Sequence, residues 1–169
     1  MVLSEKVQLP SRLGLVALLG SGALLAGAYY FQYIVGLAPC EMCYWQRYPH
    51  MAAIVAGLAA LATFPWPRVA LVFVMMAITA LIVTAAIGVF HVGVEYHWWE
   101  GPQACTGNIP RGLSPEQLKK YLFGAQMVRC DQTAWSLWGL SMAGWNALLS
   151  AILAFALASG VANWVRSRA

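Results

Sequence analysis

Long apolar runs limit what this sequence can fold into more than any other feature. Residues 13–37 are interrupted only by Ser21 and Gln32, and residues 69–94 and 145–165 are similarly apolar. About 20 apolar residues in a helix cross the hydrocarbon core of a bilayer. Each of these three runs is therefore long enough to span a membrane.

A further apolar run, residues 51–64, is shorter. At ~1.5 Å per residue it covers about 21 Å, which is less than a hydrocarbon core of ~30 Å. To span, this helix must begin near residue 44, which brings Gln46, Arg47 and His50 into the interfacial layer. We therefore expect a span over residues 44–64.

The composition supports a membrane protein of one domain covering residues 1–169. Apolar residues make up 61% of the chain and charged residues only 9%, against about 25% charged in soluble domains. The formal net charge of +4 comes without Lys/Arg runs or a glycine-rich phosphate loop. These features argue against a nucleic-acid partner and indicate that most of the surface meets membrane lipid.

The order of the runs predicts an all-α integral membrane protein, an antiparallel four-helix transmembrane bundle. The expected spans are residues 13–37, 44–64, 69–94 and 145–165. Because residues 65–68 form so short a link, the helices on either side must run antiparallel. Four spans place both termini on one side of the membrane and the loops 38–43 and 95–144 on the other.

The positive residues indicate which side is which. Five Lys/Arg lie with the termini and the short link, and five are spread over the two other loops. Because short segments near span ends weigh most, we expect cytoplasmic termini and periplasmic cysteine loops in a bacterial inner membrane. A cleaved signal peptide is the alternative for the first run, since Ala26-Gly27-Ala28 resembles a cleavage site.

The long loop contains a helix-start signal. Ser114 can cap a helix, Pro115 suits its first position, and Gln117 stands at the capping-box position. Leu118, Tyr121 and Leu122 would share one face of this helix. The helix either packs on the bundle or lies on the periplasmic membrane surface, and we favour a short interfacial helix.

Cys40 and Cys43 form a C-x-x-C pair at the start of the second expected helix, and Arg47 follows one turn later. Exposed N–H groups at a helix start and a nearby guanidinium both stabilise a thiolate. A reactive dithiol is therefore expected here. The simpler alternative is an inert disulfide beside an arginine that extends to the membrane surface.

Cys105 and Cys130 form a second possible pair in the long loop, on the same side of the membrane. Neither belongs to another C-x-x-C, and the histidines are not spaced as a ligand set, so we expect no metal. Two pairs on one side can exchange thiols and disulfides. Repeated turnover needs an electron acceptor, and a lipid-soluble quinone fits the membrane edge.

These residues resemble the DsbB family of bacterial disulfide bond formation proteins. The resemblance rests on four spans, Cys40-x-x-Cys43-x-x-Gln46-Arg47, and a last loop bearing Cys105 and Cys130. It extends to the approach to the last helix, where Asp131, Trp135, the segment 139–142 and the Trp145-Asn146 pair are similar to the family's.

The resemblance implies a disulfide-generating thiol:quinone oxidoreductase that reoxidises a periplasmic DsbA-like thiol oxidase. It implies that Cys43 interacts with ubiquinone or menaquinone and that Arg47 stabilises the interaction. It implies further that Cys105 is the sulfur attacked by the partner, and that Cys130 and Cys40 relay the exchange. The roles of Glu41, His91 and Glu95 stay open, as does the pairing of the four cysteines.

Three other functions remain possible from the sequence. A DsbB paralogue serving a dedicated partner would have the same chemistry. An enzyme resembling vitamin K epoxide reductase would place its C-x-x-C late in the bundle, whereas Cys40 and Cys43 come early. A non-enzymatic membrane subunit would use the four cysteines only as structural disulfides.

Overall fold

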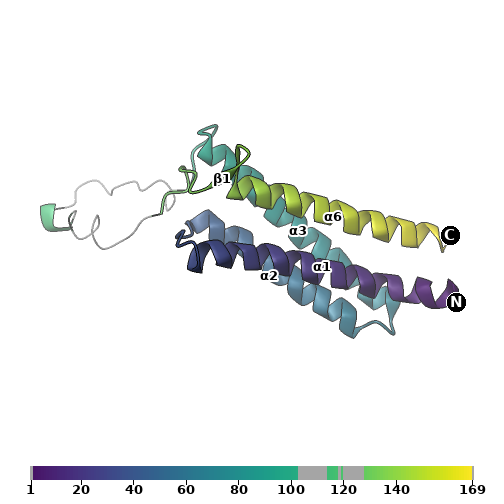
Figure 1. Cartoon of the computed structure of the whole chain (residues 1–169). Coiled ribbons are helices and arrows are strands. Elements are labelled where there is room, and N and C mark those ends of the chain that lie inside the picture. Colours follow the sequence, from purple (N-terminus) through teal and green to yellow (C-terminus); the bar gives the residue numbers. More distant parts are fainter. Residues whose placement is uncertain (1, 103–113, 118, 120–127, 169) are drawn as a thin grey trace.

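The computed structural model describes residues 2–102, 114–117, 119 and 128–168, and it is mostly helical. Its long elements are α1 (Val2–Tyr33), α2 (Glu41–Ala62), α3 (Pro67–Glu95) and α6 (Met142–Arg166). Figure 1 shows these helices lying lengthwise against one another, with both chain ends at the same end of the assembly. The start of α2 and the hairpin before α6 lie at the opposite end.

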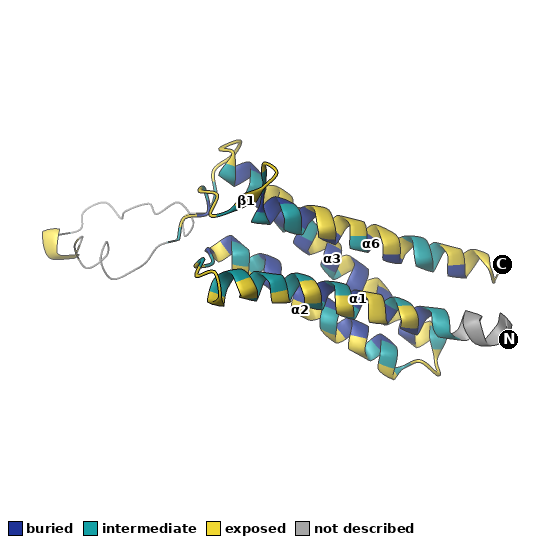
Figure 2. Cartoon of the chain, viewed as in Figure 1, coloured by how far each residue is buried: buried dark blue, intermediate teal, exposed yellow. Residues whose placement is uncertain are grey.

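Three of these helices are long and apolar enough to cross a membrane. They are Gln8–Tyr33 within α1, the whole of α3 and the whole of α6. Helix α2 has 22 residues and is long enough, but it is not apolar enough to be counted with these three. Exposed residues, yellow in Figure 2, occur along all four long helices, and many of them are large and apolar. The chain is therefore a multi-pass membrane protein.

The helix boundaries differ from the expected ones mainly at two places. Helix α1 already begins at Val2, because the preceding polar segment continues the same helix. Helix α6 begins at Met142 because Ser141 caps it, with its Oγ accepting a hydrogen bond from Gly144 N at 3.2 Å. The polar loop therefore ends before residue 144, where the sequence had suggested its end.

A small hairpin, which the sequence analysis did not predict, leads into α6. Strands β1 (Ser136–Leu137) and β2 (Leu140–Ser141) pair antiparallel, with Leu137 opposite Leu140. Trp138 and Gly139 make the two-residue turn, and both have positive φ angles, 52° and 80°. Tryptophan rarely adopts this conformation, so the pair does not stand out in sequence as a turn.

Small residues allow the helices to approach closely. A Cβ added at Gly57 of α2 would lie 2.7 Å from the Gly14 carbonyl oxygen of α1. A Cβ added at Gly88 of α3 would lie 2.9 Å from the Ala147 Cβ of α6. Helices in membranes associate through close packing of this kind. These glycines therefore allow the contacts between α1 and α2 and between α3 and α6 that position the site.

The capping box in the long loop is present. Gln117 N donates to Ser114 Oγ at 3.2 Å, and Ser114 N donates to Gln117 Oε1 at 2.9 Å. Most of the helix expected to follow lies outside the described residues, and so does Cys105.

Candidate functional site: a dithiol between a disulfide and an apolar cavity

The first cysteine pair is organised by the start of α2. Cys40 is the N-cap residue, and its Sγ accepts a hydrogen bond from Cys43 N at 3.3 Å. This cap places the two sulfurs 2.8 Å apart, and both are free thiols. Cys40 is buried, whereas Cys43 is partly exposed.

The two thiols have opposite acidities. Both cysteines precede the expected span 44–64. The hydrogen bond from Cys40 lowers the pKa of the Cys43 thiol below its ordinary value, and the charge of Arg47 acts in the same direction. The same hydrogen bond raises the pKa of Cys40, and burial raises it further. Because the thiolate is the nucleophile, Cys43 is the thiol of the pair that ionises more readily.

Cys130 brings the second pair to the first. It is buried and disulfide-bonded, and its Sγ lies within 4.8 Å of both Cys40 Sγ and a ring nitrogen of His91. Because Cys40 and Cys43 are both free thiols, the disulfide of Cys130 does not involve the first pair. A cysteine binds a metal as its thiolate, and Cys130 is in a disulfide. We therefore interpret the group of Cys40, His91 and Cys130 as an arrangement for sulfur exchange.

Arg47 is buried beside the first pair, at 6% exposure. Its guanidinium donates hydrogen bonds to Gln32 Oε1 and to the Ala28 carbonyl of α1. It also lies 5.0 Å from the ring centre of Tyr29 and 5.3 Å from that of Tyr44. Among the described residues no carboxylate pairs with it. The cation is thus available to a nearby thiolate or to an oxygen of a ligand.

A chain of hydrogen bonds runs between α2, α3 and α6 behind the dithiol. Gln46 Nε2 lies 2.8 Å from His91 Nδ1, and His91 Nε2 lies 3.6 Å from Cys40 Sγ. In the other direction, Asn146 Nδ2 donates to Gln46 Oε1 at 2.8 Å and to Thr84 Oγ1 at 3.1 Å. The chain continues to His50, whose Nε2 lies 2.8 Å from Asn146 Oδ1, and to Ser150, whose Oγ lies 3.5 Å from both of these atoms. It joins the cysteines to the interior of the helix assembly.

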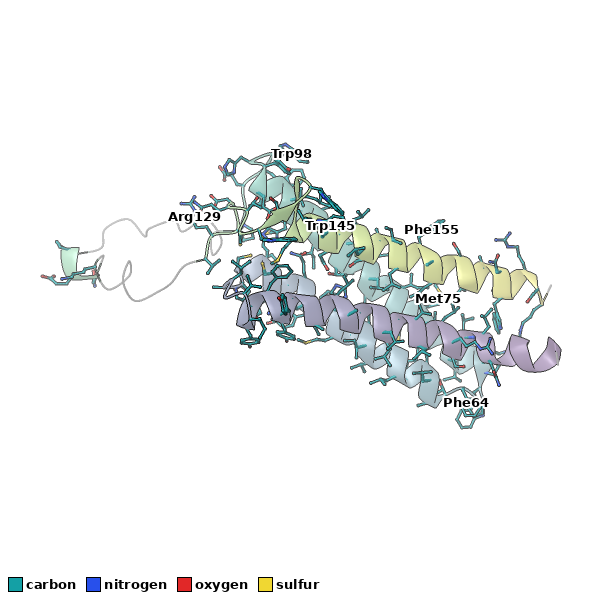
Figure 3. The ribbon with its side chains drawn as sticks, in the orientation of Figure 1. Phe64, Met75, Trp98, Arg129, Trp145 and Phe155 are labelled. Atoms are coloured by element: carbon teal, nitrogen blue, oxygen red, sulfur yellow. The ribbon has the colours of Figure 1, made fainter. Side chains whose placement is uncertain are left out.

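An apolar cavity of about 360 Å³ lies between α1, α2 and α6, a volume typical of small-molecule sites. Figure 3 shows Trp145 and Arg129, two of its lining residues, at the end of the helices away from Phe64. Three polar or charged side chains of α2 also line it, namely Gln46, Arg47 and His50, together with both Cys40 and Cys43.

The structure therefore brings together Cys40, Cys43, Arg47 and Cys130 of the predicted site, and Cys105 lies outside the described residues. His91 lies beside Cys40 and Cys130, and Glu95 contacts Ser141 at the start of α6. Neither His91 nor Glu95 lines the cavity.

The sequence analysis missed two features of the site. It placed Gln46, Arg47 and His50 in the interfacial layer but did not predict their burial among the helices, where they are 6%, 6% and 3% exposed. It also gave no role to Asn146, which binds both Gln46 and His50. The available signal was the set of polar residues inside apolar runs, which in membranes face the protein interior.

The fold and the site together define a helical membrane protein equipped for thiol–disulfide exchange. The family model described as "Disulfide bond formation protein DsbB" matches residues 10–160. This match covers most of the sequence, so the chain belongs to the DsbB family, as the resemblance had indicated.

Individual relatives agree with the family match. A disulfide bond formation protein B of Verminephrobacter eiseniae is 32% identical over 93% of this chain and 89% of the relative. A disulfide bond formation protein B of Polaromonas naphthalenivorans is 30% identical, over 94% and 95%. An uncharacterized protein of Rickettsia prowazekii, RP370, is 27% identical over 83% and 81%. No solved structure gives a significant match.

Proposed function

We propose that the protein is a thiol:quinone oxidoreductase that reoxidises a periplasmic DsbA-like thiol oxidase. The position of Cys40 is the observation that carries this proposal. Its sulfur lies 2.8 Å from Cys43 Sγ and within 4.8 Å of Cys130 Sγ. One sulfur that can reach both partners can move a disulfide from one pair to the other.

Two successive thiol–disulfide exchanges carry two electrons from the partner to the first cysteine pair. A thiolate of the reduced partner attacks Cys105 in a disulfide with Cys130, and the second partner thiol resolves the mixed disulfide. The partner leaves oxidised, and Cys105 and Cys130 hold its two electrons and protons. The Cys130 thiolate then attacks Cys40 of a Cys40–Cys43 disulfide, releasing the Cys43 thiolate. The Cys105 thiolate then attacks Cys130 in the mixed disulfide. This restores the Cys105–Cys130 disulfide and releases Cys40, so the first pair is left reduced.

The structure resembles the state after the last exchange step, with Cys40 and Cys43 free and Cys130 disulfide-bonded. The lowered pKa of Cys43 suits it to leave as a thiolate when Cys130 attacks Cys40. His91 Nε2 lies 3.6 Å from Cys40 Sγ and holds the attacked sulfur in position. The protein's own residues thus account for transfer between the pairs.

The cavity fits a quinone as the final acceptor. Its walls are mainly apolar, and it contains the buried cation of Arg47 and a buried ring nitrogen of His50 that has no hydrogen-bond partner among the residues the structure describes. When bound, ubiquinone or menaquinone supplies an acceptor for two electrons and two protons. Cys43, Cys40 and Arg47 would meet its head group, since all three line the cavity.

The proposal includes the membrane arrangement. We place the protein in a bacterial inner membrane with α2 from residue 44 onward as a fourth span, although α2 is less apolar than the other three helices. The buried polar groups of α2 are held by α1, α3 and α6. Both termini are then cytoplasmic, and the cysteine end, with an interfacial helix that starts at Ser114, faces the periplasm.

Reoxidation of a reduced partner tests the function directly. Purified protein is mixed with reduced DsbA and a short-chain ubiquinone, and both DsbA thiols and quinone absorbance are followed. We expect one quinone consumed per disulfide formed, with turnover abolished in Cys43→Ser and Cys130→Ser and retained in Thr79→Ala, an exposed position on α3. Quinone loss that continues in Cys130→Ser would remove the relay between the pairs.

A further inference from the structure

His50 is a polar residue of the cavity that the proposed sulfur exchange does not use. It lies on α2, three residues after Arg47, so its Cα is about 4.5 Å further along the helix axis. The side chain is 3% exposed and lines the cavity. Its Nε2 lies 2.8 Å from Asn146 Oδ1, whereas its Nδ1 has no hydrogen-bond partner among the described residues.

The hydrogen-bond chain assigns the tautomer of this ring. Gln46 Nε2 must donate, because one of its contacts is the Met42 carbonyl oxygen at 3.2 Å. Gln46 Oε1 therefore accepts from Asn146 Nδ2, which turns Asn146 Oδ1 toward His50. An amide oxygen can only accept. His50 Nε2 must then carry a proton, and Nδ1 of the neutral ring holds a free lone pair.

A buried acceptor without a donor destabilises a protein, and such atoms are few in native structures. Here the unpaired acceptor belongs to a ring at the wall of a ligand-sized cavity, one helical turn beyond a guanidinium. A guanidinium has only donors, so the two groups are complementary. Together they suit a ligand with an oxygen acceptor near Arg47 and an O–H donor near His50.

We propose that His50 Nδ1 binds a hydroxyl group of the reduced acceptor, and that this contact makes the site prefer quinol over quinone. This inference rests on the proposed function, because it concerns the same cavity. A quinone carbonyl has no hydrogen to donate to the neutral His50 ring, whereas a quinol hydroxyl does. The preference stabilises the product in the site and is independent of the sulfur chemistry at Cys43.

The test measures binding rather than turnover. Trp135 and Trp145 line the cavity, so quenching of tryptophan fluorescence reports its occupancy. The purified protein, with its cysteine pairs oxidised so that it cannot reduce the quinone, is titrated anaerobically with decylubiquinol and, separately, with decylubiquinone. His50→Phe removes the acceptor, His50→Gln keeps one, and Met51→Phe changes an exposed neighbour on the same turn as a control.

We expect His50→Phe to weaken quinol binding about tenfold, the effect of losing one good hydrogen bond, and quinone binding much less. His50→Gln should recover part of the loss, and Met51→Phe should match the parent. If His50→Phe weakens the binding of both ligands equally, or of neither, then no quinol hydroxyl binds Nδ1. That result would overturn this inference and leave the proposed function standing. If His50→Phe fails to fold, the preference of the parent protein decides: tighter binding of quinol than of quinone supports the inference, and equal or weaker binding of quinol overturns it. A parent protein that binds neither ligand overturns the proposed function as well.

Discussion

The side-chain amide of Gln46 and the imidazole of His91 are joined by a 2.8 Å contact between Nε2 and Nδ1. Because that amide nitrogen also donates to the Met42 carbonyl, His91 Nδ1 is the acceptor. The proton of the neutral ring then lies on Nε2, which faces Cys40 Sγ at 3.6 Å. A single amide on α2 thus determines that the nitrogen of His91 facing Cys40 Sγ carries the proton.

Replacing Gln46 by Leu should release the His91 ring. The parent is expected to show a single neutral tautomer, protonated at Nε2, whereas Gln46→Leu should show a mixture of both tautomers, because Nδ1 loses its donor. Nitrogen NMR of labelled histidine distinguishes the two. Asn163→Leu, an exposed amide on α6, is the control and should leave the signal unchanged. The same tautomer ratio in Gln46→Leu and the parent would contradict the assignment.

Arg47 should control the acidity of Cys43. The thiol pKa is lowered from 9.0, so the thiolate persists to lower pH than in an ordinary cysteine and is lost as pH falls through that lowered pKa. Arg47→Met should raise the midpoint of Cys43 alkylation by roughly one pH unit, measured by mass spectrometry across pH. Arg68→Met, at the start of α3, should leave the midpoint in place. An unshifted midpoint in Arg47→Met would show that Cys40 alone stabilises the thiolate.

Cys40 and Cys130 should crosslink more readily than Cys43 and Cys130. The Cys43→Ser/Cys105→Ser variant leaves two sulfurs that lie within 4.8 Å of each other, so mild oxidation should join them rapidly. The matched Cys40→Ser/Cys105→Ser variant leaves Cys43 and should react several times more slowly. Maleimide gel shifts follow both reactions. Faster bonding through Cys43 would reverse the proposed order of exchange.

Asn146 should stabilise the helix assembly from its interior. Asn146→Leu removes donors from Gln46 and Thr84 and an acceptor from His50. Hydrogen bonds between membrane helices contribute about 0.6 kcal/mol on average and up to ~1.7. We expect the free energy of unfolding in mixed micelles to fall by about 2 kcal/mol, against little change in Asn163→Leu. Equal values for the two variants would show that the network adds no stability.

Gly57 should be required for the contact between α1 and α2. In Gly57→Val the added Cβ would lie 2.7 Å from the Gly14 carbonyl oxygen, a backbone atom that cannot move away easily. Overpacking of this kind costs about 1–3 kcal/mol, which thermal unfolding in detergent would detect. Gly22→Val on α1 is the control, because a Cβ there meets nothing within 4 Å. Similar unfolding temperatures for the two variants would contradict close backbone packing.

Much of the helical framework could be predicted because its causes are local. Apolar runs marked α1, α3 and α6, and the Ser114–Gln117 capping box followed from spacing alone. The hairpin was missed because Trp138 takes a positive φ angle that its residue type disfavours. That strain is imposed by pairing with β2 rather than by the turn's own sequence.

The site was predictable in its chemistry but not in its arrangement. Cys40, Cys43 and Arg47 share one stretch of α2, so their spacing showed them together. The approach of Cys130 to Cys40, and the link from Gln46 to Asn146 across 100 positions, depend on how helices dock. No pattern within a single helix contains that information.

The polar chain also has a consequence for biosynthesis. Helix α2 carries the buried side chains of Gln46, Arg47 and His50, and polar and charged residues make insertion of a span less favourable. Two of these side chains bind Asn146 of α6, which is made last. When the ribosome releases α2, Arg47 can already bind α1, whereas Asn146 does not yet exist. Helix α2 should therefore become fully stable in the bilayer only after the C-terminal helix has emerged.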